Sequence, residues 1–121
     1  MDSITLKGKP LSTNTIYDFT CEPYPHMYLN DKGQSVKDKY TWMVKSEWSQ
    51  ETTEEDIELD LRLYFDNKRK HDIDNYNKLA LDILEGHVYE NDNQIQKMTI
   101  EKFYDKTNPR IEIDVKEYNE D

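Results

Sequence analysis

Two closely spaced aspartates, with a third beyond a helical segment, carry the chemistry that this sequence most clearly offers. Asp72 and Asp74 follow a basic run, and Asp92 lies in a polar turn. In an extended backbone, residues two apart point to one side, about 6.5 Å from each other. If the intervening segment returns Asp92 to this pair, the three carboxylates could hold Mg²⁺, which keeps waters for phosphate chemistry. Taken singly, each aspartate also fits a helix N-cap or a turn.

The segment between these aspartates predicts an amphipathic helix. Apolar residues recur at the spacing of one helix face, at Tyr76, Leu79, Ala80, Ile83 and Leu84. Gly86 then closes the helix, as glycine commonly does at C-termini. Lys78 lies one turn after Asp74, so both are expected on one face at the start of the helix. Asp82, one turn further on, is a candidate to orient Lys78, and a solvent-facing helix acid is the alternative.

The order of these residues has a counterpart in a known family. The motif Asp72-x-Asp74-Asn75-x-x-Lys78-x-x-x-Asp82 is followed, after Gly86, by Val88-Tyr89-x-x-Asp92-x-Gln94-Ile95. It resembles the signature of the RusA-type Holliday junction resolvases. Upstream, Met27-Tyr28-Leu29-Asn30-Asp31-Lys32-Gly33 resembles the Tyr-Leu-x-x-x-Gly segment with which that family enters its first helix. The two matches and the chain between them span residues 27–104, most of the sequence.

The resemblance implies a small homodimeric endonuclease that uses Mg²⁺ to cut four-way DNA junctions. Mapped onto this sequence, the metal-binding and catalytic aspartates are Asp72, Asp74 and Asp92, and the catalytic lysine is Lys78. Asn91 stands where the family commonly has an aspartate, and His71 stands where it usually has an arginine. These two departures bear on metal affinity and on the grip on DNA.

Further residues around the motif are candidates to bind DNA or to support the site. The basic run Lys68, Arg69 and Lys70, continued by His71, is expected to contact DNA phosphates. An ordinary loop histidine is the alternative for His71. Asn75 and Asp82 are expected to hold the aspartates and Lys78 in position without contacting the metal ion themselves.

The composition indicates one small intracellular domain spanning residues 1–121. Leu, Ile, Val and Phe make up only about a fifth of the chain, and so thin a core often needs oligomerisation for stability. The single cysteine, Cys21, cannot form an internal disulfide, which favours a reducing cytoplasm. No apolar run is long enough for a signal peptide or a membrane span, so no membrane association is expected.

The charge distribution qualifies an overall acidic balance. The net charge is −10, but residues 51–60 hold six acids and no base, and residues 112–121 hold five acids and one lysine. The remainder of the chain is balanced, so local positive potential can persist around Lys68–Lys70. The distribution excludes a protein that coats DNA unspecifically.

Periodicity predicts an α/β (α+β) fold with a small mixed sheet and two helices in the order β-α-β-α-β-β. The strands are expected over Ser3–Gly8, Ile57–Phe65, Gln94–Tyr104 and Arg110–Lys116, and the helices from Ser35 to about Ser49 and over Tyr76–Leu84. The two last strands are expected to pair as a hairpin, and a bulge is expected between Ile95 and Met98. Residues 9–25 are expected to form loop or irregular extended structure, and residues 117–121 a frayed end.

Three functions compete at this point. The first is the Mg²⁺-dependent resolvase. The second is a relative that binds branched DNA but cuts it weakly or not at all, which Asn91 would favour. The third is an acidic interaction protein that mimics DNA, which the two acidic stretches would favour. The ordered aspartate and lysine motif favours the first.

Overall fold

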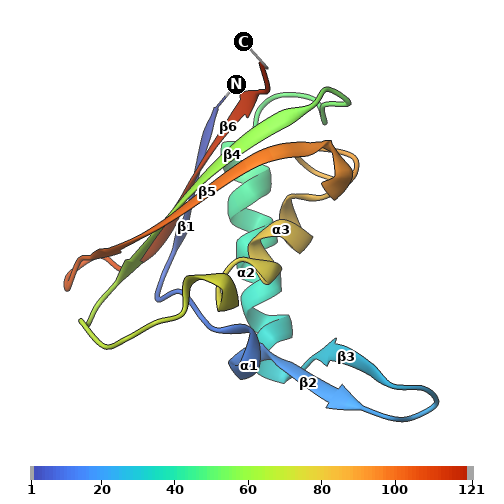
Figure 1. The fold of residues 1–121 in the computed structure, drawn as a ribbon, viewed down its shortest axis with the longest axis vertical. Coiled ribbons are helices and arrows are strands. Elements are labelled where there is room, and N and C mark those ends of the chain that lie inside the picture. Colours follow the sequence, from blue (N-terminus) through green and yellow to red (C-terminus); the bar gives the residue numbers. More distant parts are fainter. Residues whose placement is uncertain (1, 120–121) are drawn as a thin grey trace.

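Strand β4 (Ile57–Phe65) lies at the centre of the fold. Every second residue of this strand is buried, from Ile57 to Phe65, and the residues between them are half-buried. Parallel to it runs β5 (Ile95–Tyr104), and on its other side β6 (Arg110–Glu117) runs antiparallel. β1 (Ser3–Lys7) pairs with β6, which gives the sheet order β1-β6-β4-β5. The computed structural model describes residues 2–119, and this mixed sheet is its largest element (Figure 1).

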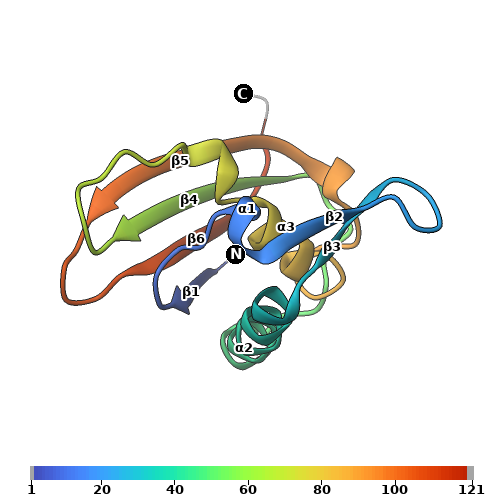
Figure 2. The ribbon, with the colours of Figure 1, turned by 90° about the horizontal axis from the view of Figure 1, so that it is seen from below.

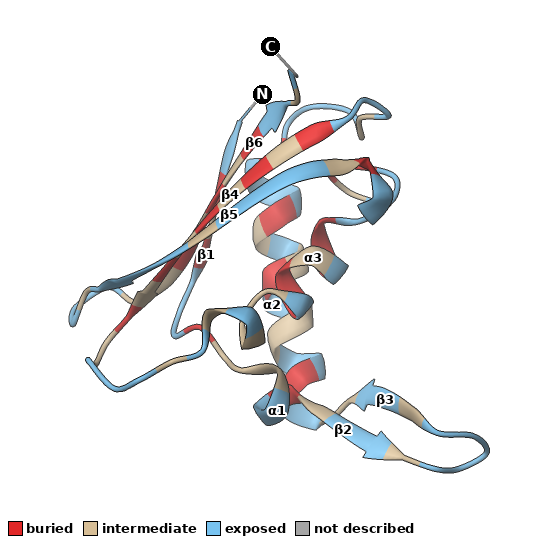
Figure 3. Ribbon diagram, in the orientation of Figure 1, coloured by how far each residue is buried: buried red, intermediate tan, exposed pale blue. Residues whose placement is uncertain are grey.

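Two helices cover one face of the sheet (Figures 1 and 2). Helix α2 (Asp31–Glu47) buries Tyr40 and Val44. The shorter α3 (Lys78–Leu84) buries the apolar face that its sequence predicts, Leu79, Ala80, Ile83 and Leu84. These side chains join the buried residues of β4, β6 and β1 in one hydrophobic core (Figure 3). No helix within residues 2–119 has the length and apolar character needed to cross a membrane.

A short β-hairpin extends away from the sheet beyond the start of α2 (Figures 1 and 2). It consists of β2 (Tyr17–Thr20) and β3 (His26–Leu29), and follows the single-turn helix α1 (Thr13–Ile16). Gly33 of α2 packs against the base of this hairpin, where a Cβ would lie 2.4 Å from the backbone oxygen of Ile16. Only glycine therefore allows α2 and α1 to approach so closely.

The other face of the sheet is held by charged pairs. Arg62 donates to Glu112 and Asp114 at 3.0 and 2.9 Å, and Arg110 donates to Glu112 at 2.8 Å. Hydrogen bonds from Arg110 and Arg62 hold the pKa of Glu112 below its usual range, and those from Arg62 and Ser3 do the same for the pKa of Asp114. Ion pairs between neighbouring strands thus cover this face of the sheet, on which no helix within residues 2–119 packs (Figure 2).

The structure confirms the main sequence predictions. The fold is mixed α+β with a small sheet, and the strands over Ser3–Lys7 and Ile57–Phe65 lie where periodicity places them. The register of β5 against β4 shifts at the predicted bulge, because Ile57 pairs with Ile95 and Glu58 with Lys97. Gly86 follows α3 with a φ of 88°, the left-handed conformation expected of a glycine that closes a helix.

Several local predictions are wrong, and the first four concern element boundaries and pairing. β5 and β6 do not form a hairpin, because β4 lies between them in the sheet. Residues 9–25 contain the regular elements α1 and β2, and then the turn into β3, where loop or irregular extended structure was expected. Helix α2 begins at Asp31 instead of Ser35, because the side chain of Asn30 accepts a hydrogen bond from the Gly33 amide and caps it there. Strand β6 continues to Glu117, where fraying was expected, and residues 120–121 lie outside the described part.

The fifth concerns the aspartate pair. Ile73–Asn75 forms a 3-10 turn, η1, so Asp72 and Asp74 are not neighbours on one side of an extended strand. Helix α3 starts only at Lys78, and Asp74 therefore does not share its first turn.

Candidate active site

The loop that leaves β4 is fixed by a stack of rings. The imidazole of His71 lies flat on the ring of Phe65, the last residue of β4, with centroids 3.9 Å apart and planes at 5°. Tyr76 meets the same phenyl ring edge-on at 5.0 Å. His71 Nδ1 lies 3.0 Å from the Tyr76 hydroxyl, and Nε2 lies 3.2 Å from Asn67 Oδ1. Because an amide oxygen only accepts, the network places a proton on Nε2.

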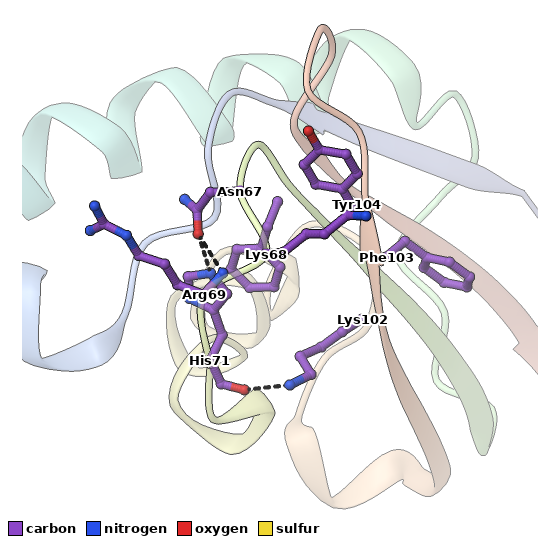
Figure 4. Close-up of a pocket in the computed structure, with 8 residues that line it drawn as sticks. Asn67, Lys68, Arg69, His71, Lys102, Phe103 and Tyr104 are labelled. Carbon is purple, nitrogen blue, oxygen red and sulfur yellow. Dashed lines mark hydrogen bonds between the residues drawn. The ribbon is translucent and has the colours of Figure 1, made fainter.

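Two further hydrogen bonds fix the backbone of this loop. Asn67 Oδ1 accepts from the Arg69 amide at 3.0 Å, and Lys102 of β5 donates to the carbonyl oxygen of His71 at 2.8 Å (Figure 4). The side chains of Lys68, Arg69 and Lys70 remain exposed along the loop. His71 thus positions the loop, and the exposed cations beside it are placed to meet an anionic ligand.

Asp72 and Asp74 lie exposed on the turn that connects this loop to α3. Asp72 stands at the N-cap position of η1, but its side chain makes no capping hydrogen bond. The turn is held through the backbone instead, by the Asn75 amide on the Asp72 carbonyl at 3.0 Å and by Thr13 Oγ1 on the Asn75 carbonyl at 2.9 Å. The capping role that Asp72 could have had is therefore not used.

Lys78 opens α3 beside Tyr17, a residue that the sequence alone places in an irregular segment and not in the site. The Lys78 Nζ lies 3.5 Å from Asp82 Oδ2 and 5.1 Å from the ring centre of Tyr17. The Tyr17 hydroxyl donates to Asp82 Oδ2 at 2.7 Å, and burial together with this bond raises the Tyr17 pKa. Asp82 thus contacts Lys78 as expected, and Tyr17 orients Asp82. Only the contact between β2 and α3 reveals this role, because the neighbours of Tyr17 in the sequence form no motif.

Asp92 begins the second 3-10 turn, η2 (Asp92–Gln94), directly before β5. The hydroxyl of the fully buried Tyr89 donates to Asp92 Oδ1 at 2.7 Å. Burial and this bond to Asp92 raise the Tyr89 pKa, so the phenol stays neutral. The Asp92 amide in turn donates to Glu85 Oε2 at 2.9 Å. Asp92 therefore has a structural role in this turn as well as an exposed carboxylate.

Asn91 and Gln94 complete a capping box around η2. Asn91 Oδ1 accepts from the Asn93 amide at 2.9 Å, and Gln94 Oε1 accepts from the Glu90 and Asn91 amides, each at 2.8 Å. The buried Gln94 also donates to the carbonyl oxygens of Thr53 and Glu55. Gln94, a motif residue to which the sequence assigned no role, thereby attaches the acidic loop Glu51–Asp56 to the start of β5.

The topology separates the aspartates within one chain. Asp72 and Asp74 follow the end of β4, whereas Asp92 precedes the start of β5, and these two strands are parallel. Residues that leave one parallel strand and residues that enter the next lie at opposite ends of the sheet. Within residues 2–119, no three His, Cys, Asp or Glu side chains are grouped closely enough to hold a metal ion.

The donor chemistry nevertheless suits a magnesium ion shared with DNA. Mg²⁺ prefers oxygen ligands and is commonly held by one or two carboxylates together with waters and substrate phosphates. Asp72 and Asp74 each expose a carboxylate to solvent on one turn, and either can supply an oxygen ligand beside the substrate phosphate. The residues present fit the ion in that form, without a complete protein cage in the single chain.

One of the comparisons with known proteins identifies a family. The endodeoxyribonuclease RusA family matches residues 8–116, which include every candidate site residue named above. No curated protein matches the sequence. Nucleases of this family act on Holliday junctions and generally depend on divalent metal ions. With a match over almost all of its 121 residues, the chain belongs to the endodeoxyribonuclease RusA family.

Proposed function

We propose that this protein is a Mg²⁺-dependent endodeoxyribonuclease that resolves four-way DNA junctions by paired nicking, as a homodimer. One observation carries the proposal: along a chain of the RusA family, two exposed aspartates follow an exposed basic run and precede an exposed lysine. We further propose that residues 1–121 act as one domain in the cytoplasm, where the exposed, unpaired Cys21 would stay reduced.

The chain's own residues divide the work between binding and chemistry. Lys68, Arg69 and Lys70 hold DNA phosphates on the loop that the stack of His71 on Phe65 makes rigid. Lys78 stabilises negative charge that develops at the scissile phosphate, and Asp82 with Tyr17 keeps its ammonium in place. Asn75 fixes the turn that carries the aspartates through its backbone bonds.

Asp72, Asp74 and Asp92 are the residues that would hold the ion. When bound, Mg²⁺ supplies Lewis-acid activation of water and neutralises charge on the phosphate. Because β4 and β5 run parallel, one chain does not gather all three carboxylates. A site that uses all three would therefore draw them from two chains.

This separation of the aspartates supports the homodimer. The thin hydrophobic core supports it as well, and a two-fold dimer matches the paired scissile phosphates of a four-way junction. Sedimentation at micromolar concentration should give about twice the chain mass of 14.6 kDa. A monomer, with and without junction DNA, would contradict paired nicking.

The decisive test of the function is cleavage of a synthetic four-way junction. The protein with Mg²⁺ should nick two opposite strands of the junction, and a linear duplex of the same sequence should remain intact. Chelation of the metal should stop cleavage and leave binding. Cleavage of the duplex at the same rate would contradict a resolvase.

A relative that binds branched DNA but cuts it weakly is the second candidate, because Asn91 stands where the family commonly has an acid. The structure makes this testable. An aspartate at position 91 could accept the same hydrogen bond from the Asn93 amide, so Asn91→Asp should fold normally. If the wild type binds junctions without cutting them and Asn91→Asp cuts, this second candidate is correct. A DNA mimic, the third candidate, would bind no junction at all.

A further inference from the structure

A hollow of about 280 Å³ lies where β4 and β5 end side by side (Figure 4). From the loop after β4 it is lined by Lys68, Arg69 and His71, and from β5 by Lys102, Phe103 and Tyr104. The volume is at the lower limit for sites of small molecules, so it suits one small planar group. Three cations and exposed aromatic rings together favour an anionic ligand with a flat part.

The rings in this hollow differ in how far they are engaged. Phe65 is covered by His71, with ring centres 3.9 Å apart, and Phe103 stacks on Tyr64 at 5.0 Å. Among residues 2–119, Tyr104 has no aromatic partner; it is 46% exposed, and the Lys68 ammonium lies over its ring at 5.0 Å. Tyr104 is thus the platform that remains open to a ligand.

Lys68 does not prevent stacking on this ring. Its side chain is long, exposed and attached to a loop, so the ammonium can swing from the ring to a phosphate at low cost. The stack of a nucleobase on an aromatic ring is stronger than an exposed contact between a cation and a ring. Lys102, by contrast, is held by the His71 carbonyl at 2.8 Å and keeps the wall of the hollow in place.

We propose that this hollow binds one unpaired nucleotide of branched DNA, with the base stacked on Tyr104 and its phosphate held by Lys68 and Arg69. The proposal rests on the proposed function and deepens it. A base inside a duplex is already stacked on both faces and cannot lie on the ring unless it leaves the helix. At an open branch point, where strands exchange, the last base pair of each arm has lost one stacking neighbour, so its base leaves the pair at a lower cost than a base within an arm. The hollow thereby selects branched over linear DNA.

The test compares the affinities of the full-length protein for a four-way junction and for a linear duplex, in EDTA so that no strand is cut. Tyr104→Ala should weaken junction binding about tenfold and leave duplex binding unchanged, because the base no longer has a ring to stack on. Tyr104→Phe keeps the ring and should bind as the wild type does. Tyr28→Ala is the matched control: Tyr28 is a strand tyrosine that is 44% exposed, close to the value for Tyr104, but it lies on the β2–β3 hairpin. Melting curves should show all three variants folded, because the substituted side chains are exposed.

A cross-link gives the direct observation. With 5-iodouracil at the branch point, ultraviolet light should join the DNA to Tyr104, and the same base in the middle of an arm should not react there. A Tyr104→Ala protein with wild-type affinity for the junction, or with equally weakened binding to junction and duplex, would overturn the proposal. If that variant still cleaved junctions, the proposed nuclease function would remain supported although the nucleotide site would not. A wild-type protein that binds no junction overturns both.

Discussion

The two ends of strand β4 differ in charge and in the way that they are held. β4 begins after the acidic loop Glu51–Asp56 and ends before the basic run Lys68–Lys70 (Figure 1). The nine residues of the strand separate these segments by about 26 Å, more than twice the Debye length at physiological salt. Salt therefore screens most of the electrostatic repulsion between DNA bound at the basic end and the acidic loop at the other end.

The acidic end is organised by neutral hydrogen bonds. Gln94 connects the η2 turn to the acidic loop, and the Tyr118 amide donates to the Asp56 carbonyl at 2.9 Å. At the basic end, the stack of His71 on Phe65 holds the loop in place, and the side chains of Lys68, Arg69 and Lys70 remain exposed. The net charge of −10 is thus a poor guide to DNA binding, because the acidic loop Glu51–Asp56 and the basic run Lys68–Lys70 lie at opposite ends of β4.

The largest expected effect is the loss of DNA cleavage when one of the three aspartates, which lie toward both ends of β4, is replaced. Asp72→Asn, Asp74→Asn and Asp92→Asn each remove one charge at nearly constant size. Loss of the metal removes several kcal/mol of barrier reduction, so cleavage should fall by about 10³-fold or more. Cleavage of a labelled junction under single-turnover conditions measures this.

Folding and junction binding should survive all three changes. Asp72 makes no capping bond, and an asparagine at position 92 can still accept from the Tyr89 hydroxyl. Wild-type cleavage rates in the three folded variants would show that these aspartates are not the metal ligands.

The next effect concerns affinity. Replacing Lys68, Arg69 and Lys70 by glutamine should weaken junction binding and reduce the slope of log K against log salt by about 0.9 for each phosphate that the protein no longer neutralises. Glu54→Gln with Glu55→Gln, at the acidic end, should leave the slope unchanged and serves as the control. Fluorescence anisotropy at several salt concentrations measures both. Equal slopes in the two sets would remove the distinction between the ends.

At the acidic end the expected effect is on stability. Gln94→Ala removes an acceptor from two backbone amides and a donor from two carbonyl oxygens, and the free energy of unfolding should fall by about 2 kcal/mol. Urea denaturation measures the change. The junction affinity of the folded protein in EDTA should stay at the wild-type value, and a tenfold weaker affinity would show that DNA binding depends on the η2 turn as well as on the basic run.

The smallest effect lies between the two ends, at Lys78. Tyr17→Phe removes the hydroxyl that donates to Asp82 and should lower the free energy of unfolding by about 0.5–1 kcal/mol, since the site is partly open to water. Cleavage should slow by a few fold while KM is kept, because Lys78 would be held less firmly. Tyr28→Phe on the same hairpin should change neither quantity.

Much of the architecture could be predicted from local patterns. The alternation of apolar and polar residues over Ile57–Phe65 predicted the central strand. It did so because every second side chain of this strand is buried in the hydrophobic core. The buried face of α3 followed from the spacing of Leu79, Ala80, Ile83 and Leu84. The hairpin of β2 and β3 was not predicted, because Pro23 and Pro25 indicate loop and because Phe19 and Met27, exposed on its strands, give no pattern of burial.

Long-range pairing could not be read from the strands alone. Two strands joined by the turn at Thr107–Pro109 suggest a hairpin, but a strand-helix-strand unit, β4-α3-β5, requires a parallel pair and brings β6 to the other side of β4. The same unit places Asp92 away from Asp72 and Asp74. The motif named the site residues, and whether they act as proposed stays a prediction.

Hydrogen exchange of the protein, with and without junction DNA in EDTA, compares the two ends most directly. The account predicts slower exchange of backbone amides in residues 67–78 and 102–105 when the junction is bound. Exchange in residues 51–56, the acidic loop, should not change. Protection of the acidic end, with none at the basic end, would contradict the account.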